Sequence, residues 1–169
     1  MISEERKNKI KYSLKNTKER RKNQIITIVK TKIYMDKLSN KTVNTLKILF
    51  LESKWLYNYV INREFTDDLF KTDYRINCVD VYVIDHYEKR KLKYLSSQMK
   101  QGLIERARDN IKSLHELKNN GFKVGSLRFK SFISSIPLKQ FNNTYKITNN
   151  SYIRIQGIKQ PLRVQTVNE

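Results

Sequence analysis

Residues 92–121 read LKYLSSQMKQGLIERARDNIKSLHELKNNG. Apolar side chains recur in this stretch at helical spacing and form one continuous stripe: Leu95, Met99, Leu103, Ala107, Ile111, Leu114 and Leu117. This period predicts an amphipathic helix from about residue 91 to residue 119. Asn119, Asn120 and Gly121 tolerate left-handed backbone, so the helix is expected to end there.

A second long helix is predicted upstream. Ser39 or Asn40 supplies an N-cap, and the apolar residues that follow keep helical spacing through about Arg63: Val43, Leu46, Phe50, Tyr57, Val60 and Ile61. Between the two helices, the run CVDVYVI at 78–84 alternates well enough to predict a short strand or an extended connection.

Strand-like segments flank the two helices. VKTKIYM at 29–35 alternates apolar and basic residues, which predicts a strand with one basic face. After Gly121 come short β-rich pieces: SLRFKSF (126–132), SIPLKQF (135–141), TYKIT (144–148), SYIRIQGI (151–158) and PLRVQT (161–166). Asn149-Asn150 is a hairpin signal. The sequence therefore predicts an α+β fold, a small barrel or sandwich that is joined by 29–35 and carries the helical pair as an insertion.

Charge is the strongest indication of function. The 169 residues hold 35 Lys and Arg against 16 Asp and Glu, a net charge of +19, with a pI near 10.0. Such an excess is typical of nucleic-acid-binding proteins, with a membrane surface or simple solubility as alternatives. Residues 1–23 carry nine Lys and Arg and almost no large apolar residue, which predicts a flexible basic arm.

The basic residues after the second helix are not mixed with acids. Residues 119–168 contain no Asp or Glu and eight cations: Lys123, Arg128, Lys130, Lys139, Lys146, Arg154, Lys159 and Arg163. In SYIRIQGI, the alternation turns Ile153 and Ile155 to the core and puts a ring, a guanidinium and an amide on the other face: Tyr152, Arg154 and Gln156. This set suits stacking on bases and pairing with phosphates. Other aromatic residues also adjoin basic or amide side chains, such as Phe129 beside Arg128 and Lys130, Phe141 beside Gln140, and Tyr34 near Lys32.

No catalytic, cofactor or metal site is predicted. The acids are scattered, and Glu105, Asp109 and Glu116 are interpreted as a helix surface paired with neighbours such as Arg106, Arg108 or Lys112. His86 and His115 lack ligand partners at metal spacing, and the four glycines form no phosphate loop. One cysteine, Cys78, excludes an internal disulfide and is expected in the core. There is no secretory signal or long apolar run, so a cytoplasmic protein without membrane contact is expected.

Three stretches in order resemble a known family. WLYNYVINR (55–63), LKYLSSQMKQGLIERARDNIKSLHELKNNGFKVGSLRFKSF (92–132) and SIPLKQFNNTYKI with SYIRIQGIKQPLRVQ (135–165) are similar to the N-terminal half of transposon-encoded TnpB (OrfB-type) proteins and related type V CRISPR effectors. The resemblance covers about residues 24–167. It implies an oligonucleotide-binding-type wedge barrel (24–36 plus 122–167) with an inserted helical recognition lobe (37–121), after the basic arm (1–23).

The resemblance also implies a function and its residues. In that family this half holds the guide RNA, reads a short motif beside the target DNA, and cradles the guide-target duplex. By matched motif, Ser97, Gln98, Lys100 and Gln101 would face the duplex, Tyr57 and Asn58 would lie by the target-adjacent motif, and Lys130, Lys139, Arg154 and Lys159 would grip RNA or phosphate. The RuvC-like nuclease with its three carboxylates and zinc finger, which follows in the family, is not among these residues. The chain is therefore expected to be either a fragment of such a protein or a separate polypeptide that works with a nuclease partner or as a binder alone. The alternatives are a stand-alone DNA-binding regulator of a mobile element and a ribosomal-type RNA-binding protein.

Overall fold

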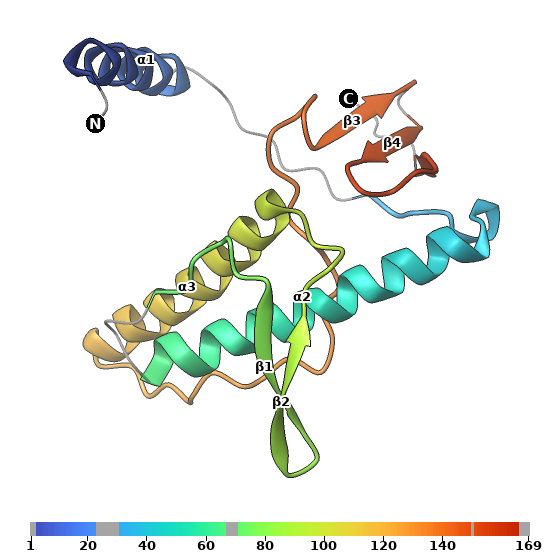
Figure 1. The fold of residues 1–169 in the computed structure, drawn as a ribbon. Coiled ribbons are helices and arrows are strands. Elements are labelled where there is room, and N and C mark those ends of the chain that lie inside the picture. Colours follow the sequence, from blue (N-terminus) through green and yellow to red (C-terminus); the bar gives the residue numbers. More distant parts are fainter. Residues whose placement is uncertain (1–2, 23–30, 67–70, 150, 166–169) are drawn as a thin grey trace. The chain divides into compact units, whose positions relative to one another are not determined.

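The computed structural model describes residues 3–22, 31–66, 71–149 and 151–165. The chain forms two compact units, Met1–Lys30 and Thr31–Glu169. In the described residues the fold is α+β, as predicted, with three α-helices and two small antiparallel sheets (Figure 1). None of these helices combines the length and the apolarity that a bilayer span requires.

The first unit contains helix α1, Glu4–Lys22. This helix lies within the basic arm predicted at 1–23, and the flexibility of that arm stays a prediction. Lys, Arg, Glu and Leu are strong helix formers, and Glu4 and Glu5 favour the start of the helix. Ion pairs of 3.1 Å link Lys7 to Glu4 and Lys9 to Glu5. The side chains described for α1 are nearly all exposed, so the helix buries no apolar face.

Two packed helices form the centre of the second unit. Helix α2, Asn40–Thr66, begins after Ser39, whose hydroxyl accepts a hydrogen bond from the backbone N–H of Thr42 at 3.3 Å. Helix α3, Ser97–Asn119, packs along it and ends as predicted, with Gly121 at φ 81°. The core between the helices includes Leu56, Val60, Leu103 and Ala107, which are fully buried.

The start of α3 was predicted six residues too early. Ser96 caps the helix by accepting from the backbone N–H of Met99 at 3.3 Å, so Leu95 lies before the helix although it is buried. The non-helical stretch is held by Glu52 of α2, whose buried carboxylate accepts three backbone N–H groups, from Lys93, Tyr94 and Leu95, at 2.8–3.1 Å. These bonds satisfy the amides that a continuous helix would have satisfied itself.

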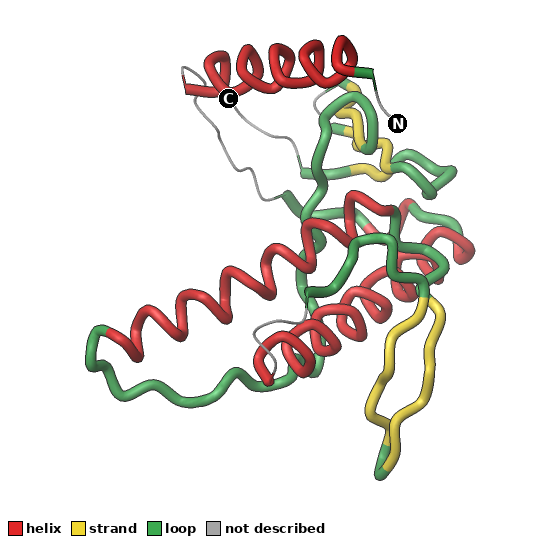
Figure 2. Tube along the Cα trace, turned by 60° about the vertical axis from the view of Figure 1, so that its left-hand side comes forward, coloured by secondary structure: helices red, strands yellow, loops and turns green. Residues whose placement is uncertain are grey.

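The region between the helices is a β-hairpin. Strand β1, Cys78–Val83, pairs with β2, His86–Lys91, and Val79 anchors it in the core. The predicted short strand at 78–84 is confirmed for 78–83. Cys78 is only half-buried. Figures 1 and 2 both show the far half of this hairpin extending away from α2 and α3.

The second sheet lies near the C-terminus. Strands β3, Tyr145–Thr148, β4, Tyr152–Ile155, and β5, Leu162–Arg163, are antiparallel in the order β3-β4-β5. The predicted hairpin is confirmed by the pairing of β3 with β4, and Asn149 has a φ of 50°, whereas residue 150 lies outside the described residues. The sheet is open in the described residues, so the closed barrel was not found there.

The segment before α2 joins this sheet beyond β5, as predicted. Ile33 forms an antiparallel bridge with Val164, and the backbone N–H of Tyr34 donates to the carbonyl oxygen of Arg163 at 2.9 Å. The predicted strand extends too far at its C-terminal end, because a single 3-10 turn, Met35–Lys37, follows. Its first residues, 29–30, lie outside the described residues.

The strands predicted at 126–132 and 135–141 are not present. Residues 122–140 instead run back along the helices as an extended segment without a strand partner (Figure 2). Asn58 of α2 holds it with two hydrogen bonds to the main chain of Lys130, and Gly102 of α3 gives room to Pro137. A Cβ atom at Gly102 would lie 2.8 Å from Pro137 Cγ. The alternation was real, but it turns apolar residues towards the helices rather than into a sheet.

Candidate nucleic-acid interface

The outer face of the C-terminal sheet carries polar, cationic and aromatic side chains in two rows. Residues directly opposite each other in an antiparallel sheet share a face. The pairing places Thr148, Tyr152 and Arg163 in one row across β3, β4 and β5, and Lys146 and Arg154 in the next. Tyr152, Arg154, Lys146 and Arg163 are exposed, whereas Leu162 is buried on the other face. The predicted division of residues 152–156 between two faces is confirmed.

The first row continues past the edge of β5. The guanidinium of Arg163 lies over the ring of Tyr34, with 5.5 Å from Cζ to the ring centroid. The row therefore runs from Tyr34 through Arg163 to Tyr152. Tyr34 is 45% exposed and Tyr152 is 41% exposed, so both rings remain accessible.

A hollow of about 420 Å³ opens beside this row. Basic and polar groups line it together with two apolar ones: Lys37, Leu38, Thr148, Tyr152, Arg154, Gln160, Pro161 and Arg163. Gln160 fixes one wall, because its amide accepts from the backbone N–H of Ser39 and donates to the carbonyl of Lys37, both at 3.0 Å. These bonds tie the loop after β4 to the start of α2.

A second hollow, of about 650 Å³, is also lined by Gln160. The first turns of α2 and the loop at 157–160 line it, and Lys41, Lys159 and Tyr94 contribute side chains. The two hollows share Gln160, so the cationic surface continues from the sheet to the N-terminal turns of α2.

Most of the cations in the acid-free segment are uncompensated. Seven of the eight are exposed and have no carboxylate within ion-pair distance in the described part of the chain: Lys123, Arg128, Lys130, Lys146, Arg154, Lys159 and Arg163. The eighth, Lys139, is half-buried and pairs with Glu105 of α3. This pair corrects the partner expected for Glu105, which was a residue on its own helix. For Glu116 the prediction is confirmed, with Lys112 at 3.7 Å.

The extended segment 122–140 presents further cations. Arg128, Phe129 and Lys130 are all exposed, and the two bonds from Asn58, at 2.8 and 3.0 Å, hold the main chain at Lys130 while its ammonium stays exposed. Lys123 and Gln140 are also exposed, and Gln140 accepts a hydrogen bond from the amide of Asn143 at 2.9 Å. The role of Asn58 seen here is to position this segment.

Two of the predicted contact residues are buried in the structure. Tyr57 is only 2% exposed, and its hydroxyl accepts from the amide of Asn110 at 2.6 Å, so its ring belongs to the core. Lys100 is 5% exposed and donates to the carbonyl of Ile76 and to the side chain of Asn77. Burial lowers the pKa of Lys100. Tyr57 lies on the apolar stripe predicted for its helix, whereas Lys100, which is not on the predicted stripe, is buried beside the loop at 76–77.

The remaining residues of that motif stay predictions. Ser97 is exposed and Gln98 is half-buried on the first turn of α3, while Gln101 donates to Glu105 at 3.0 Å. Gln156 is exposed after β4.

Tyr34, Lys37 and Gln160 were not selected from the sequence as site residues. For Tyr34 a signal existed, because it alternates with Ile33 and Met35 on the basic face of that segment.

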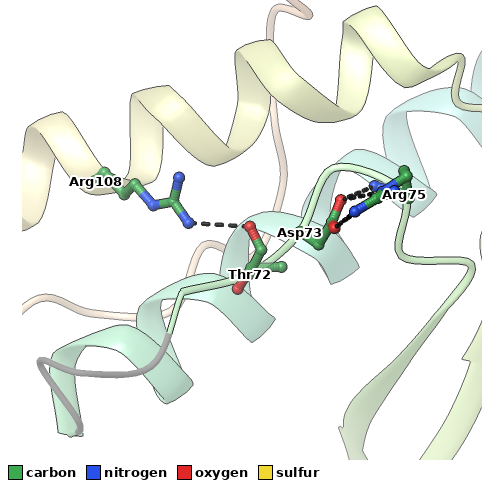
Figure 3. A network of polar contacts seen from close by, with 4 residues as sticks. All are labelled: Thr72, Asp73, Arg75 and Arg108. Atoms are coloured by element: carbon green, nitrogen blue, oxygen red, sulfur yellow. Dashed lines mark hydrogen bonds and ion pairs between the residues drawn. The ribbon is translucent and has the colours of Figure 1, made fainter. Parts of the chain in front are cut away.

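A polar network fixes the loop between α2 and the hairpin. The carboxylate of Glu64, on α2, accepts two bonds from Arg108, on α3, at 2.7 and 2.9 Å, and one from the backbone N–H of Thr72 at 2.7 Å. Arg108 also donates to the carbonyl of Thr72 at 3.0 Å, and Asp73 binds Arg75 next to it (Figure 3). These bonds join two helices and a loop, which makes the network a structural one.

Neither a metal centre nor a relative was found. Within the described residues, no three His, Cys, Asp or Glu side chains gather where they could share a metal ion. Comparison of the chain with protein-family models, with curated proteins and with solved structures finds no match.

Proposed function

We propose that this chain binds nucleic acid through the outer face of the β3-β4-β5 sheet and the adjoining segment 122–140. The observation that carries the proposal is the set of seven exposed cations without a carboxylate partner in the described residues. Some cations elsewhere in the second unit do have such partners, as in Arg63–Asp80, Arg90–Glu88 and Arg108–Glu64. Uncompensated charge on one acid-free segment is typical of a surface that meets phosphates.

The proposal includes a more specific role, as the wedge and recognition half of a TnpB-like RNA-guided nuclease. Two features support it: Ile33 and residues 145–164 meet in one sheet, and α2 and α3 lie between them in the sequence. The partners would be a guide or structured RNA and target DNA, and the metal-binding carboxylates would belong to a RuvC-like nuclease domain. In this role the open sheet is part of an oligonucleotide-binding-type wedge, and the helical pair is the recognition lobe.

The chemistry of such binding is electrostatic and geometric. Arg154 and Arg163 present guanidinium forks that match phosphate oxygens, and Lys146, Lys159 and Lys130 add point charges. Each phosphate contact releases condensed counterions, so affinity falls with salt. A surface of this kind reads backbone and shape and leaves sequence to base pairing.

The salt dependence of RNA binding tests the proposal. Arg154→Ala and Lys130→Ala are each expected to weaken binding and to lower the slope of log K against log salt by about one, because each removes one phosphate contact. Lys139→Ala is the matched control from the same segment. Its ammonium already pairs with Glu105, so the slope should change less. Fluorescence anisotropy between low and physiological salt gives these slopes.

Two outcomes would contradict the proposal. Equal slopes in all four proteins would exclude Arg154 and Lys130 from the surface. For the more specific role, RNA that copurifies with the chain should have a discrete size and a defined structure. Tight operator binding without RNA, or sedimentation with ribosomes, would instead support a regulator or a ribosomal-type protein.

A further inference from the structure

The row from Tyr34 to Tyr152 has a geometry that phosphate binding alone does not require. By strand register Arg163 lies between two exposed tyrosines: its guanidinium carbon is 5.5 Å from the centroid of the Tyr34 ring, and Tyr152 is its direct partner in the sheet. Neighbouring strands are about 4.8 Å apart, so the backbone positions of Tyr34 and Tyr152 are about 10 Å apart on the two sides of Arg163. An accessible ring on each side of a cation offers stacking surface in addition to charge.

The hollow beside this row has room and chemistry for one nucleotide. Its volume of about 420 Å³ lies in the range of small-molecule sites, which is about 300–1,000 Å³. Leu38, Pro161 and the ring of Tyr152 provide apolar wall, and Lys37 and Arg154 provide charge at the same opening. A base needs a flat apolar partner and its phosphate needs a cation, and both are present here.

We infer that this row, Tyr34–Arg163–Tyr152, seats an unpaired nucleotide, with the base on the Tyr152 ring and the phosphate between Arg154 and Lys37. The inference rests on the proposed function and adds selectivity for single-stranded nucleic acid. A base inside a duplex is stacked on both faces and cannot lie on a protein ring, whereas an unpaired base can. The cations alone would bind both forms.

Replacement of the ring separates stacking from charge. Tyr152→Leu keeps an apolar side chain and removes the π face, and Tyr152→Phe keeps the ring and removes only the hydroxyl. We expect Tyr152→Leu to weaken binding of an unstructured single-stranded oligonucleotide about 5- to 150-fold, which corresponds to one lost base stack. Affinity for a duplex of the same sequence, and the salt slope, should stay unchanged, and Tyr152→Phe should retain single-strand affinity.

Two further measurements complete the test. Tyr82→Leu is a matched control, because Tyr82 is an exposed tyrosine, at 55%, on the β1–β2 hairpin and away from the row. It should leave single-strand affinity unchanged. Irradiation of a bound strand that contains 5-iodouridine should attach it to Tyr152 or Tyr34, as mass spectrometry of the peptides would show. Thermal melts confirm that each variant is folded.

The results that overturn the inference differ from those that overturn the proposed function. Equal weakening of single strand and duplex by Tyr152→Leu, or unchanged single-strand binding, would exclude a stacking seat. Loss of affinity in Tyr152→Phe as large as in Tyr152→Leu would assign the effect to the hydroxyl and not to the ring. Failure of the unaltered protein to bind either substrate would instead reject nucleic-acid binding as a whole.

Discussion

Ile84 lies at the tip of the β1–β2 hairpin with a φ of 56°, in the left-handed region that favours glycine. The backbone N–H of Asp85 donates to the carbonyl of Val83 at 2.7 Å, so Ile84 is the central residue of a tight three-residue turn. A β-branched side chain is strained in this conformation. Because Ile84 is 92% exposed, burial does not offset the strain.

Ile84→Gly is therefore expected to stabilise the protein, by about 1 kcal/mol, through relief of that strain. Chemical denaturation followed by circular dichroism would measure the gain. Asn149→Gly is the comparison, since Asn149 has a φ of 50° but belongs to a residue type that tolerates it. Its gain should be smaller. A loss of stability in Ile84→Gly would mean that the side chain makes a stabilising contact after all.

At the scale of elements, the helices and their connecting loop are joined by the Glu64 network. Burial alone would raise the pKa of Glu64, but hydrogen bonds from Arg108 and from Thr72 outweigh it, so its pKa is lowered. A carboxylate with a lowered pKa binds fewer protons in the folded than in the unfolded state. Its stabilisation is thus present at neutral pH and lost as the pH falls through the ordinary glutamate pKa of about 4.3 and towards the lower folded value.

We expect Glu64→Gln to make the free energy of unfolding less dependent on pH in the acid range. At pH 7 it should lower the free energy of unfolding by about 2 kcal/mol, because Gln has one acceptor oxygen where Glu64 has two, so one bond from Arg108 is lost and the guanidinium loses its counter-charge. The difference from the unaltered protein should shrink below about pH 4. Urea melts at several pH values would show this, with Glu116→Gln as control, because Glu116 is exposed and its partner Lys112 is 3.7 Å away. If the free energy of unfolding of Glu64→Gln and that of the unaltered protein fell in parallel as the pH was lowered, other carboxylates would account for the loss of stability in acid.

At the scale of the whole molecule, the net charge of +19 dominates. Like charges repel one another more strongly in the compact chain than in the expanded one, and salt screens this repulsion. Moderate salt is therefore expected to raise the melting temperature, by about 2–4 °C for each kcal/mol by which screening weakens this repulsion. Calorimetry from low to high NaCl would measure the shift.

A variant with three fewer charges provides the control. Lys123, Arg128 and Lys146 are exposed and unpaired with acids in the described residues, so their joint replacement by Gln leaves packing intact. Its melting temperature should rise less with salt. An identical rise would indicate a general salt effect on burial rather than relief of repulsion.

Local sequence was sufficient for the elements whose own residues specify them. Helical spacing predicted α2 and the body of α3, Asn149 predicted the turn between β3 and β4, and alternation predicted that Tyr152 and Arg154 share a face. In each case the signal lies within a few residues of the feature: a cap, a period or a turn residue. The uncompensated charge of the last fifty residues could likewise be read from their composition.

What depended on distant partners could not be read in this way. Residues 126–141 alternate like strands, yet they lie along α2 and α3 because Asn58 and Gly102, far away in the sequence, receive them. Tyr57 belongs to the apolar stripe that helical spacing predicted, but the burial of Lys100 depends on its contacts with the loop at 76–77. Two further contacts exist only in the folded chain: Lys139 forms an ion pair with Glu105, and the guanidinium of Arg163 lies over the ring of Tyr34. Ion pairing and burial depend on contacts between residues that are distant in the sequence. Composition and hydrophobic periodicity do not specify which of these residues come into contact.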